Sequence, residues 1–198
     1  MPAFSHIVFF LYNYTQYDCA VEILRMGEIV VLVPDKLFLQ ITSITAELLA
    51  RENVQGLVLD IDYTLADKHT PLPDSAVKEF VENMKQAQIR LFILSNNNHN
   101  RVSRFAKALD LPYRSNGLKP LPNAFSYAVD LMKLDKKEVV AVGDQVYTDV
   151  WGAHLAGLRA WMVAPYGGGG RSFFYRFRRL LEKPFIHSCK PEDEQVSK

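Results

Sequence analysis

The amino-acid sequence predicts an α/β fold, a three-layer α/β/α sandwich built around a central parallel sheet. Four short apolar runs, at residues 56–60, 90–94, 138–142 and 160–163, are continuous rather than alternating, which is typical of strands buried on both faces of a parallel sheet. Segments with helical spacing lie between these runs. Strands and helices in strict alternation imply right-handed crossovers, and therefore helices on both faces of the sheet.

Three segments between the predicted strands each carry one apolar stripe with the i, i+3, i+4, i+7 spacing of a helix. Asp74 can cap the first of these helices, and Pro122 suits the first turn of the third. The apolar positions are Val77, Phe80, Val81 and Met84 in the first, Val102, Phe105, Ala106 and Leu109 in the second, and Phe125, Ala128, Val129 and Met132 in the third.

Length and composition narrow the function classes. A chain of 198 residues with 48% hydrophobic and 23% charged residues is typical of a globular protein with one core. The formal net charge of +1 provides no general attraction to nucleic acid, so we expect no nucleic-acid partner. No run approaches the ~20 apolar residues of a membrane-spanning helix. No Lys or Arg precedes the apolar run at 7–12, which argues against a secretory signal. We expect a cytoplasmic protein with Cys19 and Cys189 as reduced thiols.

The chain divides into three parts. Residues 1–53 are an N-terminal segment that packs on or leads into the core, residues 54–165 form the core, and residues 166–198 contain a Gly-rich hinge, a basic amphipathic helix and a tail. The hinge is "GGGG" at 167–170, which is not a phosphate-binding loop because no Gly-Lys-Ser/Thr follows it. Residues 1–25 are rich in aromatic side chains and poorly periodic, and Met26 is an alternative start of the chain.

Polar side chains follow the predicted strands at the points where the strands end. In open α/β sheets, ligands bind beyond the carboxyl ends of the strands. Four segments would therefore bring carboxylates, a hydroxyl and an ammonium to one edge of the sheet, which indicates a site for a phosphate and a divalent cation. The residues are Asp60 and Asp62 in "DIDYTL", Ser95 and Asn96 in "SNNNHN", Lys119 in "GLKPLP", and Asp144 and Asp149 in "GDQVYTD".

The chemistry of phosphate transfer assigns a role to each side chain. Asp60 can attack phosphorus, and Asp62, two residues on and on the same side of the chain, can protonate the leaving oxygen and later activate water. Mg²⁺ prefers oxygen ligands, which Asp60 and Asp144 can supply. Lys119 would neutralise the remaining charge, and Ser95, together with the neighbouring Asn96, would bind the phosphate oxygens.

This constellation resembles the haloacid dehalogenase (HAD) superfamily of phosphatases over about residues 54–165. "DIDYTL" is similar to the first motif of that family, Ser95 to the second, Lys119 to the third and "GDQVYTD" to the fourth. The resemblance implies that Asp60 is the nucleophile, that Asp62 is the general acid/base, and that Asp60, Asp144 and the backbone carbonyl of Asp62 hold Mg²⁺. Asp149 then has a supporting role.

Within that superfamily the chain looks closest to the YqeG-like group of subfamily IIIA. The matching features are "LVPDKLF", "SNN" after the second strand, and a Lys-Pro pair followed by a helix that contains Phe. Relatives of this group in mitochondria and plastids are phosphatidylglycerophosphate phosphatases, which makes this lipid the best single substrate expectation. A soluble phosphatase for a nucleotide or sugar phosphate and a non-catalytic binding module remain the alternatives. Tyr63 replaces the Asn that often follows the second aspartate.

Simpler structural roles compete with these assignments. Asp60 and Asp62 could form a turn, Ser95 and Asn96 could cap a helix that starts near His99, and Lys119 could be a surface lysine. Asp149 is equally suited to be the N-cap of a helix at 150–157.

Two features concern access to the site. Only 34 residues separate Asp60 from Ser95 and 23 separate Ser95 from Lys119, which leaves no room for a large cap domain.

The segment 171–183 has the pattern of an amphipathic helix. One helical face carries Phe173, Phe174, Phe177, Leu180 and Leu181, and the other carries Arg171, Arg176, Arg178, Arg179 and Lys183. This pattern predicts peripheral contact with the inner face of a membrane. The alternative is a helix packed on the core with an arginine-rich outer face.

Overall fold

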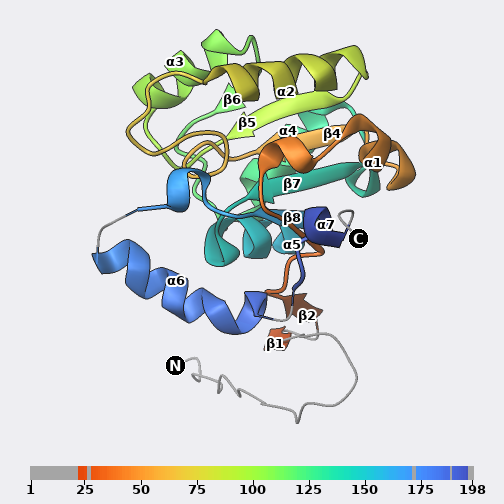
Figure 1. Cartoon of the computed structure of the whole chain (residues 1–198). Helices are drawn as coiled ribbons and strands as arrows, with labels where there is room; N and C mark the ends of the chain where they lie inside the picture. The colour runs from red at the N-terminus through yellow and green to blue at the C-terminus, as the bar shows by residue number, and fades with distance from the viewer. Residues whose placement is uncertain (1–21, 26–27, 171–172, 188, 196–198) are drawn as a thin grey trace, which may run out of the picture.

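The computed structural model describes residues 22–25, 28–170, 173–187 and 189–195. Its centre is a six-stranded, all-parallel sheet with strand order β3-β8-β7-β4-β5-β6, and a separate antiparallel hairpin is formed by β1 and β2 (Figure 1). The strands are β1 (Glu22–Arg25), β2 (Glu28–Val31), β3 (Lys36–Phe38), β4 (Gly56–Leu59), β5 (Arg90–Leu94), β6 (Tyr113–Arg114), β7 (Val139–Gly143) and β8 (Arg159–Val163).

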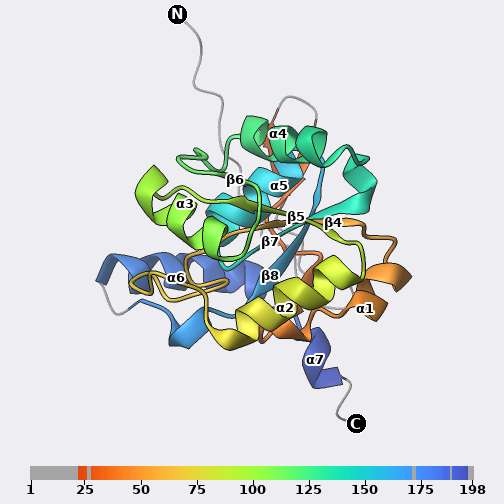
Figure 2. The same ribbon diagram turned by 90° about the horizontal axis from the view of Figure 1, so that it is seen from above.

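Helices cover both faces of the sheet, which confirms the three-layer sandwich. Figure 2 shows α4 and α5 on one side of the sheet and α1 and α2 on the other. The helices are α1 (Ala46–Arg51), α2 (Ser75–Gln86), α3 (His99–Ala108), α4 (Pro122–Met132), α5 (Trp151–Leu155), α6 (Phe173–Ile186) and α7 (Glu192–Gln195). Shorter helical turns are η1 (Ile41–Ser43), η2 (Lys136–Glu138), η3 (Val146–Val150) and η4 (Tyr166–Gly168).

The predicted apolar runs are the central strands, and their burial explains why they are continuous. All four residues of β4 and all five of β7 are buried. Successive side chains point to opposite faces, so Leu57 and Leu59 join the core under α1, α2 and α3, whereas Val58 joins the core under α4 and α5. Both faces are apolar because both are covered by helices.

The predicted helix starts are also found. The Asp74 carboxylate accepts a hydrogen bond of 2.9 Å from the backbone N–H of Val77 and so caps α2. Pro122 stands in the first turn of α4, where a missing N–H costs nothing. The helix near His99 is capped by Asn98, whose side chain accepts from the N–H of Arg101, rather than by Ser95 or Asn96.

The N-terminal part contributes β3 to the sheet, at the edge beside β8. Phe38 at its end is 1% exposed and its ring lies 5.5 Å from that of Trp161 in β8. The hydrophobic core therefore extends into the part of the chain before residue 54. The expectations for Cys19 and for Met26 as an alternative start concern residues outside those that the structure describes.

The C-terminal part contains the glycine run and α6, which lies beside the carboxyl edge of the sheet (Figures 1 and 2). The end of the run packs closely, since a Cβ added to Gly170 would lie 2.7 Å from the Tyr63 hydroxyl, whereas one added to Gly168 would meet nothing within 4 Å. Helix α6 packs on the core, as the alternative to membrane contact predicts. The face that it turns outward is not the arginine-rich one which that alternative expected. Arg178 and Arg179 face inward beside the fully buried Glu182, and Phe173 is 83% exposed. The arginine-rich outer face is therefore wrong for these two arginines.

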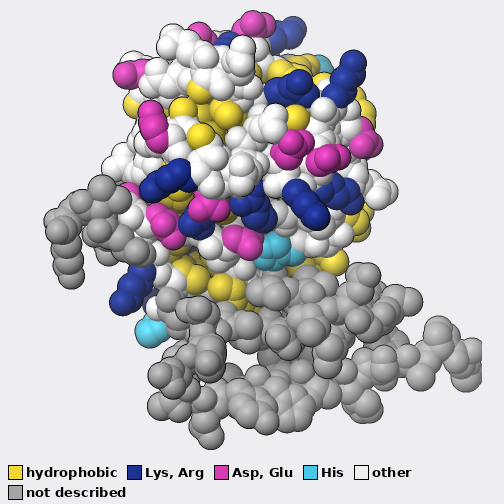
Figure 3. Space-filling view, turned by 90° about the vertical axis from the view of Figure 1, so that its right-hand side faces the viewer, with side chains coloured by type: hydrophobic (Ala, Val, Ile, Leu, Met, Phe, Trp, Pro, Cys, Tyr) yellow, Lys and Arg dark blue, Asp and Glu magenta, His cyan; other side chains and the backbone are white. Residues whose placement is uncertain are grey.

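Surface charge is mixed on the side of the molecule where the strands begin. This side, on the right in Figure 1, carries basic and acidic side chains close to one another (Figure 3). None of the described helices is long and apolar enough to cross a membrane.

We expect Phe38→Ala to lower the free energy of unfolding by about 3 kcal/mol or more, because truncating a buried Phe leaves a cavity against Trp161. Leu39→Ala is the matched control, since Leu39 is the next residue and is 43% exposed, and it should change stability by about 0.5 kcal/mol or less. Urea denaturation measures both. Equal effects would mean that β3 is not part of the core.

Candidate active site

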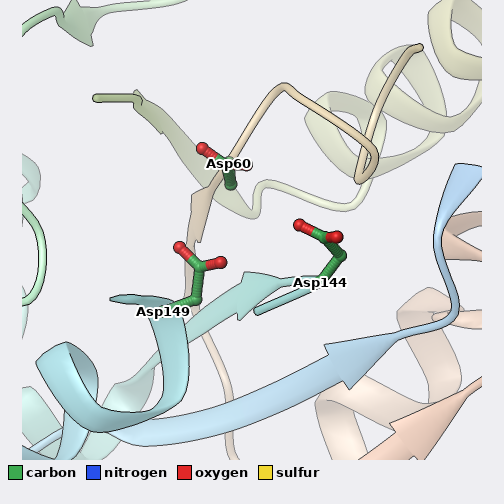
Figure 4. Close-up of side chains that lie close together, drawn as sticks. All are labelled: Asp60, Asp144 and Asp149. Carbon is green, nitrogen blue, oxygen red and sulfur yellow. The ribbon is translucent and has the colours of Figure 1, made fainter. Parts of the chain in front are cut away.

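Three aspartates converge at the carboxyl edge of the sheet. Asp60 follows β4, Asp144 follows β7, and Asp149 lies in η3, the π-helical turn before α5 (Figure 4). One carboxylate oxygen from each lies within 4.8 Å of the others, and all three residues are buried. Gly143 makes this approach possible, because a Cβ there would lie 2.3 Å from Cγ of Asp149.

Lys119 is the cation of this cluster. Its Nζ donates to Oδ1 of Asp60 and to Oδ1 of Asp149, each at 2.6 Å, and its side chain is 4% exposed. Lys119 is therefore not a surface lysine. Its ammonium contacts two of the three carboxylates, and Asp144 is not one of them.

Asp144 gives the clearest sign that the cluster could hold a cation. It is fully buried, and neither of its carboxylate oxygens accepts a hydrogen bond from any residue that the structure describes. An ionised carboxylate without a partner is costly inside a protein. A divalent cation with a preference for oxygen ligands fits this donor set of Asp60, Asp144 and Asp149.

Protons compensate for part of the charge when no cation is bound. Burial raises the pKa of Asp60 to about 7, against the opposing effect of Lys119, and Asp149 adds to the rise. Burial also raises the pKa of Asp144 well above its ordinary value, with further contributions from Asp149 and Asp60. Burial tends to lower the pKa of Lys119, but Asp149 and Asp60 outweigh it and raise that pKa, so Lys119 stays charged.

Ser95 and Asn96 follow β5 and approach the cluster from the neighbouring strand. Ser95 is buried, and its Oγ accepts a 3.2 Å hydrogen bond from the N–H of Asn97, which leaves its O–H for a ligand. The Asn96 amide binds the backbone of Lys119 on both sides, accepting from its N–H at 2.7 Å and donating to its carbonyl at 3.0 Å. Asn96 thus holds the loop that carries Lys119, and its direct contact with phosphate stays a prediction.

Asp62 is not one of the three clustered aspartates, and its carboxylate is held by two residues outside the predicted site. Arg101 donates from Nε and Nη2 to Oδ1 of Asp62, at 2.9 and 2.6 Å, and Asn97 donates from Nδ2 to Oδ2 at 2.9 Å. No sequence signal marks Arg101, because it lies 39 positions from its partner.

Asp149 is part of the cluster and not a helix cap. Its Oδ2 accepts a 3.1 Å hydrogen bond from the N–H of Gln145, and its Oδ1 binds Lys119. The N-cap position of α5 is Val150, so the alternative of an Asp149 cap is wrong.

Helix α6 contacts the loop that carries Asp144. Arg179 donates from Nη1 to the carbonyl of Asp144 at 2.5 Å, and Glu182 accepts a 3.2 Å hydrogen bond from the N–H of Val146. On the same side, the ring of Tyr175 lies 4.9 Å from that of Tyr63, which follows Asp62. Tyr63 therefore connects the first motif to α6. Glu182, the single acidic residue among the basic ones of α6, is the signal that sequence reasoning could have used.

Without a divalent cation, we expect the melting temperature to fall as the pH rises from 5 to 8. The pKa of Asp60 is about 7 in the folded protein and its ordinary value is 3.8, so the folded state binds more protons in this range and loses stability as they leave. Millimolar Mg²⁺ should raise the melting temperature more at pH 8 than at pH 5.5, because it replaces those protons. Differential scanning fluorimetry measures both effects.

Asp144→Asn is the informative variant for this prediction. It removes the buried charge without a partner, so the fall in melting temperature with pH should become shallower and the increase caused by Mg²⁺ should be lost. An undiminished increase with Mg²⁺ in this variant would show that the cation binds elsewhere.

Comparisons with known proteins agree with this geometry. A family model described as haloacid dehalogenase-like hydrolase matches residues 12–157. The chain is 35% identical over 158 residues to the probable phosphatase YqeG of Bacillus subtilis (strain 168), and this match covers 80% of the chain and 91% of that protein.

Two solved structures are similar to this chain. A putative 3-deoxy-D-manno-octulosonate 8-phosphate phosphatase from Vibrio cholerae has a TM-score of 0.50 and 14% identity, covering 72% of this chain and 89% of that one. A putative HAD superfamily (subfamily III A) hydrolase from Legionella pneumophila has a TM-score of 0.45 and 17% identity, covering 72% and 90%. Because the family model covers more than half of the chain and includes every motif of the site, the chain belongs to the haloacid dehalogenase-like hydrolases.

Proposed function

We propose that the chain is a Mg²⁺-dependent phosphomonoester hydrolase that acts through an aspartyl-phosphate on Asp60. The observation that carries the proposal is the buried cluster of Asp60, Asp144 and Asp149 around Lys119, in which Asp144 lacks a partner among the described residues. Similarity to a protein named as a probable phosphatase supports the same reaction.

The side chains suit the two half-reactions. In the first, a carboxylate oxygen of Asp60 attacks phosphorus, the bond from phosphorus to the leaving oxygen breaks, and that oxygen takes a proton from Asp62. In the second, Asp62 takes a proton from water, the water oxygen attacks phosphorus, and the bond from Asp60 to phosphorus breaks to release phosphate. Asp60, Asp144 and the backbone carbonyl of Asp62, with Asp149 in support, would hold Mg²⁺, which would supply positive charge that draws the phosphate to the carboxylate.

Two donors are available to bind the phosphate. Lys119 uses two of its three N–H groups for Asp60 and Asp149, which leaves the third for a phosphate oxygen. The Ser95 hydroxyl accepts from Asn97, so its own O–H can donate. Asn96 positions Lys119, because its side chain forms hydrogen bonds with the backbone N–H and carbonyl of Lys119.

The best substrate proposal is phosphatidylglycerophosphate. Between Asp60 and Lys119 the chain forms a loop, α2, β5, α3 and β6, without a cap domain, so the site is not enclosed by an insertion. A site without a cap suits a phosphate on a large or membrane-embedded molecule. The resemblance to the YqeG-like group points to this lipid among such substrates. A soluble nucleotide or sugar phosphate is the alternative.

The outward face of α6 supports contact with an anionic membrane. Phe173, Phe177, Leu180 and Leu181 are exposed along one stripe, and Arg176 and Lys183 are exposed beside it. Apolar side chains with flanking basic ones are typical of a helix that lies in a membrane interface. A second copy of the chain is a poor occupant, because pairing two such faces would bring basic side chains together. We therefore propose a cytoplasmic protein that binds the inner face of a membrane peripherally.

We expect Asp60→Asn to reduce Mg²⁺-dependent hydrolysis of 4-nitrophenyl phosphate at least about 1,000-fold, because the amide cannot attack phosphorus. Asp110→Asn is the matched control, since Asp110 is exposed at the end of α3. Released nitrophenol measures both. Equal activity of Asp60→Asn and the unchanged protein would remove Asp60 as nucleophile, and inactivity of the unchanged protein would favour a binding module.

We expect Leu180→Glu to weaken sedimentation with anionic phosphatidylglycerol vesicles about 10-fold or more, because it removes an apolar contact and adds a negative charge. Leu131→Glu on α4 is the matched control, with a side chain 45% exposed compared with 57% for Leu180. Hydrolysis of a soluble ester should be unchanged in both variants. If the unchanged protein and both variants all fail to sediment with the vesicles, the soluble substrate is favoured.

A further inference from the structure

We propose that Arg101 is a positioning residue that orients the Asp62 carboxylate so that Oδ2 exchanges the proton with the leaving oxygen. This inference rests on the proposed function, and it assigns a task in that reaction to a residue on α3, outside the strand-end motifs. Three observations support it: the way Arg101 is fixed, the division of the Asp62 oxygens, and the place of Arg101 in its helix.

The guanidinium of Arg101 is fixed by the backbone as well as by Asp62. Nη1 donates to the carbonyl of Thr70 at 2.7 Å, and Nη2 donates to the carbonyl of Asp67 at 3.1 Å. Nε and Nη2 both donate to Oδ1 of Asp62. Because a guanidinium is planar, these two carbonyls set the plane in which it meets the carboxylate. The ion pair is partly buried, with side-chain exposures of 15% and 17%.

The two oxygens of Asp62 are left unequal by these contacts. Oδ1 accepts two hydrogen bonds from Arg101, whereas Oδ2 accepts one, from Asn97. A carboxylate oxygen has two acceptor positions, so Oδ2 keeps one for the proton that is exchanged. Asn97 is itself connected to the phosphate site, because its N–H donates to Oγ of Ser95. Oδ2 is therefore the oxygen held in a fixed relation to the phosphate position.

The place of Arg101 in α3 argues against a role in helix stability. It lies in the first turn of the helix, after His99 and Asn100. The amino end of a helix carries partial positive charge, so an arginine is unfavourable there and an acidic residue is preferred. Departures from such local preferences are expected at functional sites.

The test uses two aryl esters that differ in how much their leaving oxygen needs a proton. Phenyl phosphate releases a weakly acidic phenol, whereas 4-nitrophenyl phosphate releases a far more acidic one. General acid catalysis contributes roughly 100- to 10,000-fold where the proton is needed. We expect Arg101→Ala to lower kcat/KM about 100-fold for phenyl phosphate and about 5-fold or less for 4-nitrophenyl phosphate, with saturating Mg²⁺.

The ratio of the two kcat/KM values separates positioning from folding. A smaller folded fraction lowers both values equally, so it leaves their ratio unchanged. Arg101→Lys should restore part of the ratio, because lysine keeps the charge without the planar fork. Arg104→Ala is the matched control on the same helix, with an exposed side chain, and should leave the ratio at its original value.

The outcomes distinguish this inference from the proposed function. The positioning role is overturned if the unchanged protein hydrolyses both esters and Arg101→Ala lowers kcat/KM by the same factor for each. It is also overturned if Arg101→Ala lowers kcat/KM more for 4-nitrophenyl phosphate than for phenyl phosphate. Asp62→Asn should show the same change of ratio, and combining it with Arg101→Ala should change the ratio no further. A further change in the double variant would also overturn the proposal. If Asp60→Asn is as active as the unchanged protein, the proposed function itself fails.

Discussion

The burial of three carboxylates at the end of an apolar sheet is the constraint on which the rest of the structure depends. Asp60, Asp144 and Asp149 lie together in a place where ionised groups are costly. One lysine balances part of this charge, and the amide of Asn96 fixes the backbone from which that lysine extends. The demand for positive charge that remains is what a divalent cation would satisfy. The site is thus a destabilised region that the surrounding sheet maintains.

The sequence predicted the centre of the fold well because burial on both faces makes the strands continuous in apolar residues. The edge strands β3 and β6 have three and two residues, which is too short for any periodicity to be recognised. The side chains at the strand ends were predictable for a geometric reason, since the carboxyl ends of parallel strands meet at one edge. Asp60, Lys119, Asp144 and Asp149 are all found together there.

The residues that were missed are placed by tertiary contacts rather than by local pattern. Arg101 and Asn97 reach Asp62 across 39 and 35 positions of the chain, and Glu182 reaches Val146 across 36. The orientation of α6 is likewise set by tertiary contacts that the local sequence pattern does not reveal. An amphipathic pattern normally directs the apolar face inward. In α6, ion pairs of Arg178 and Arg179 with Glu182 occupy the inner face, so the apolar residues Phe173, Phe177, Leu180 and Leu181 are exposed.

The contact between α6 and the Asp144 loop has a thermodynamic consequence. Arg179 binds the carbonyl of the residue whose carboxylate is proposed to hold the cation, and Glu182 binds the N–H of Val146 two residues later. Any change in how firmly α6 is seated therefore acts on the loop that presents Asp144. Linkage is reciprocal, so a cation that stabilises this loop stabilises the seated helix by the same free energy. Cation binding at the aspartate cluster and attachment of the C-terminal helix would then form one coupled equilibrium.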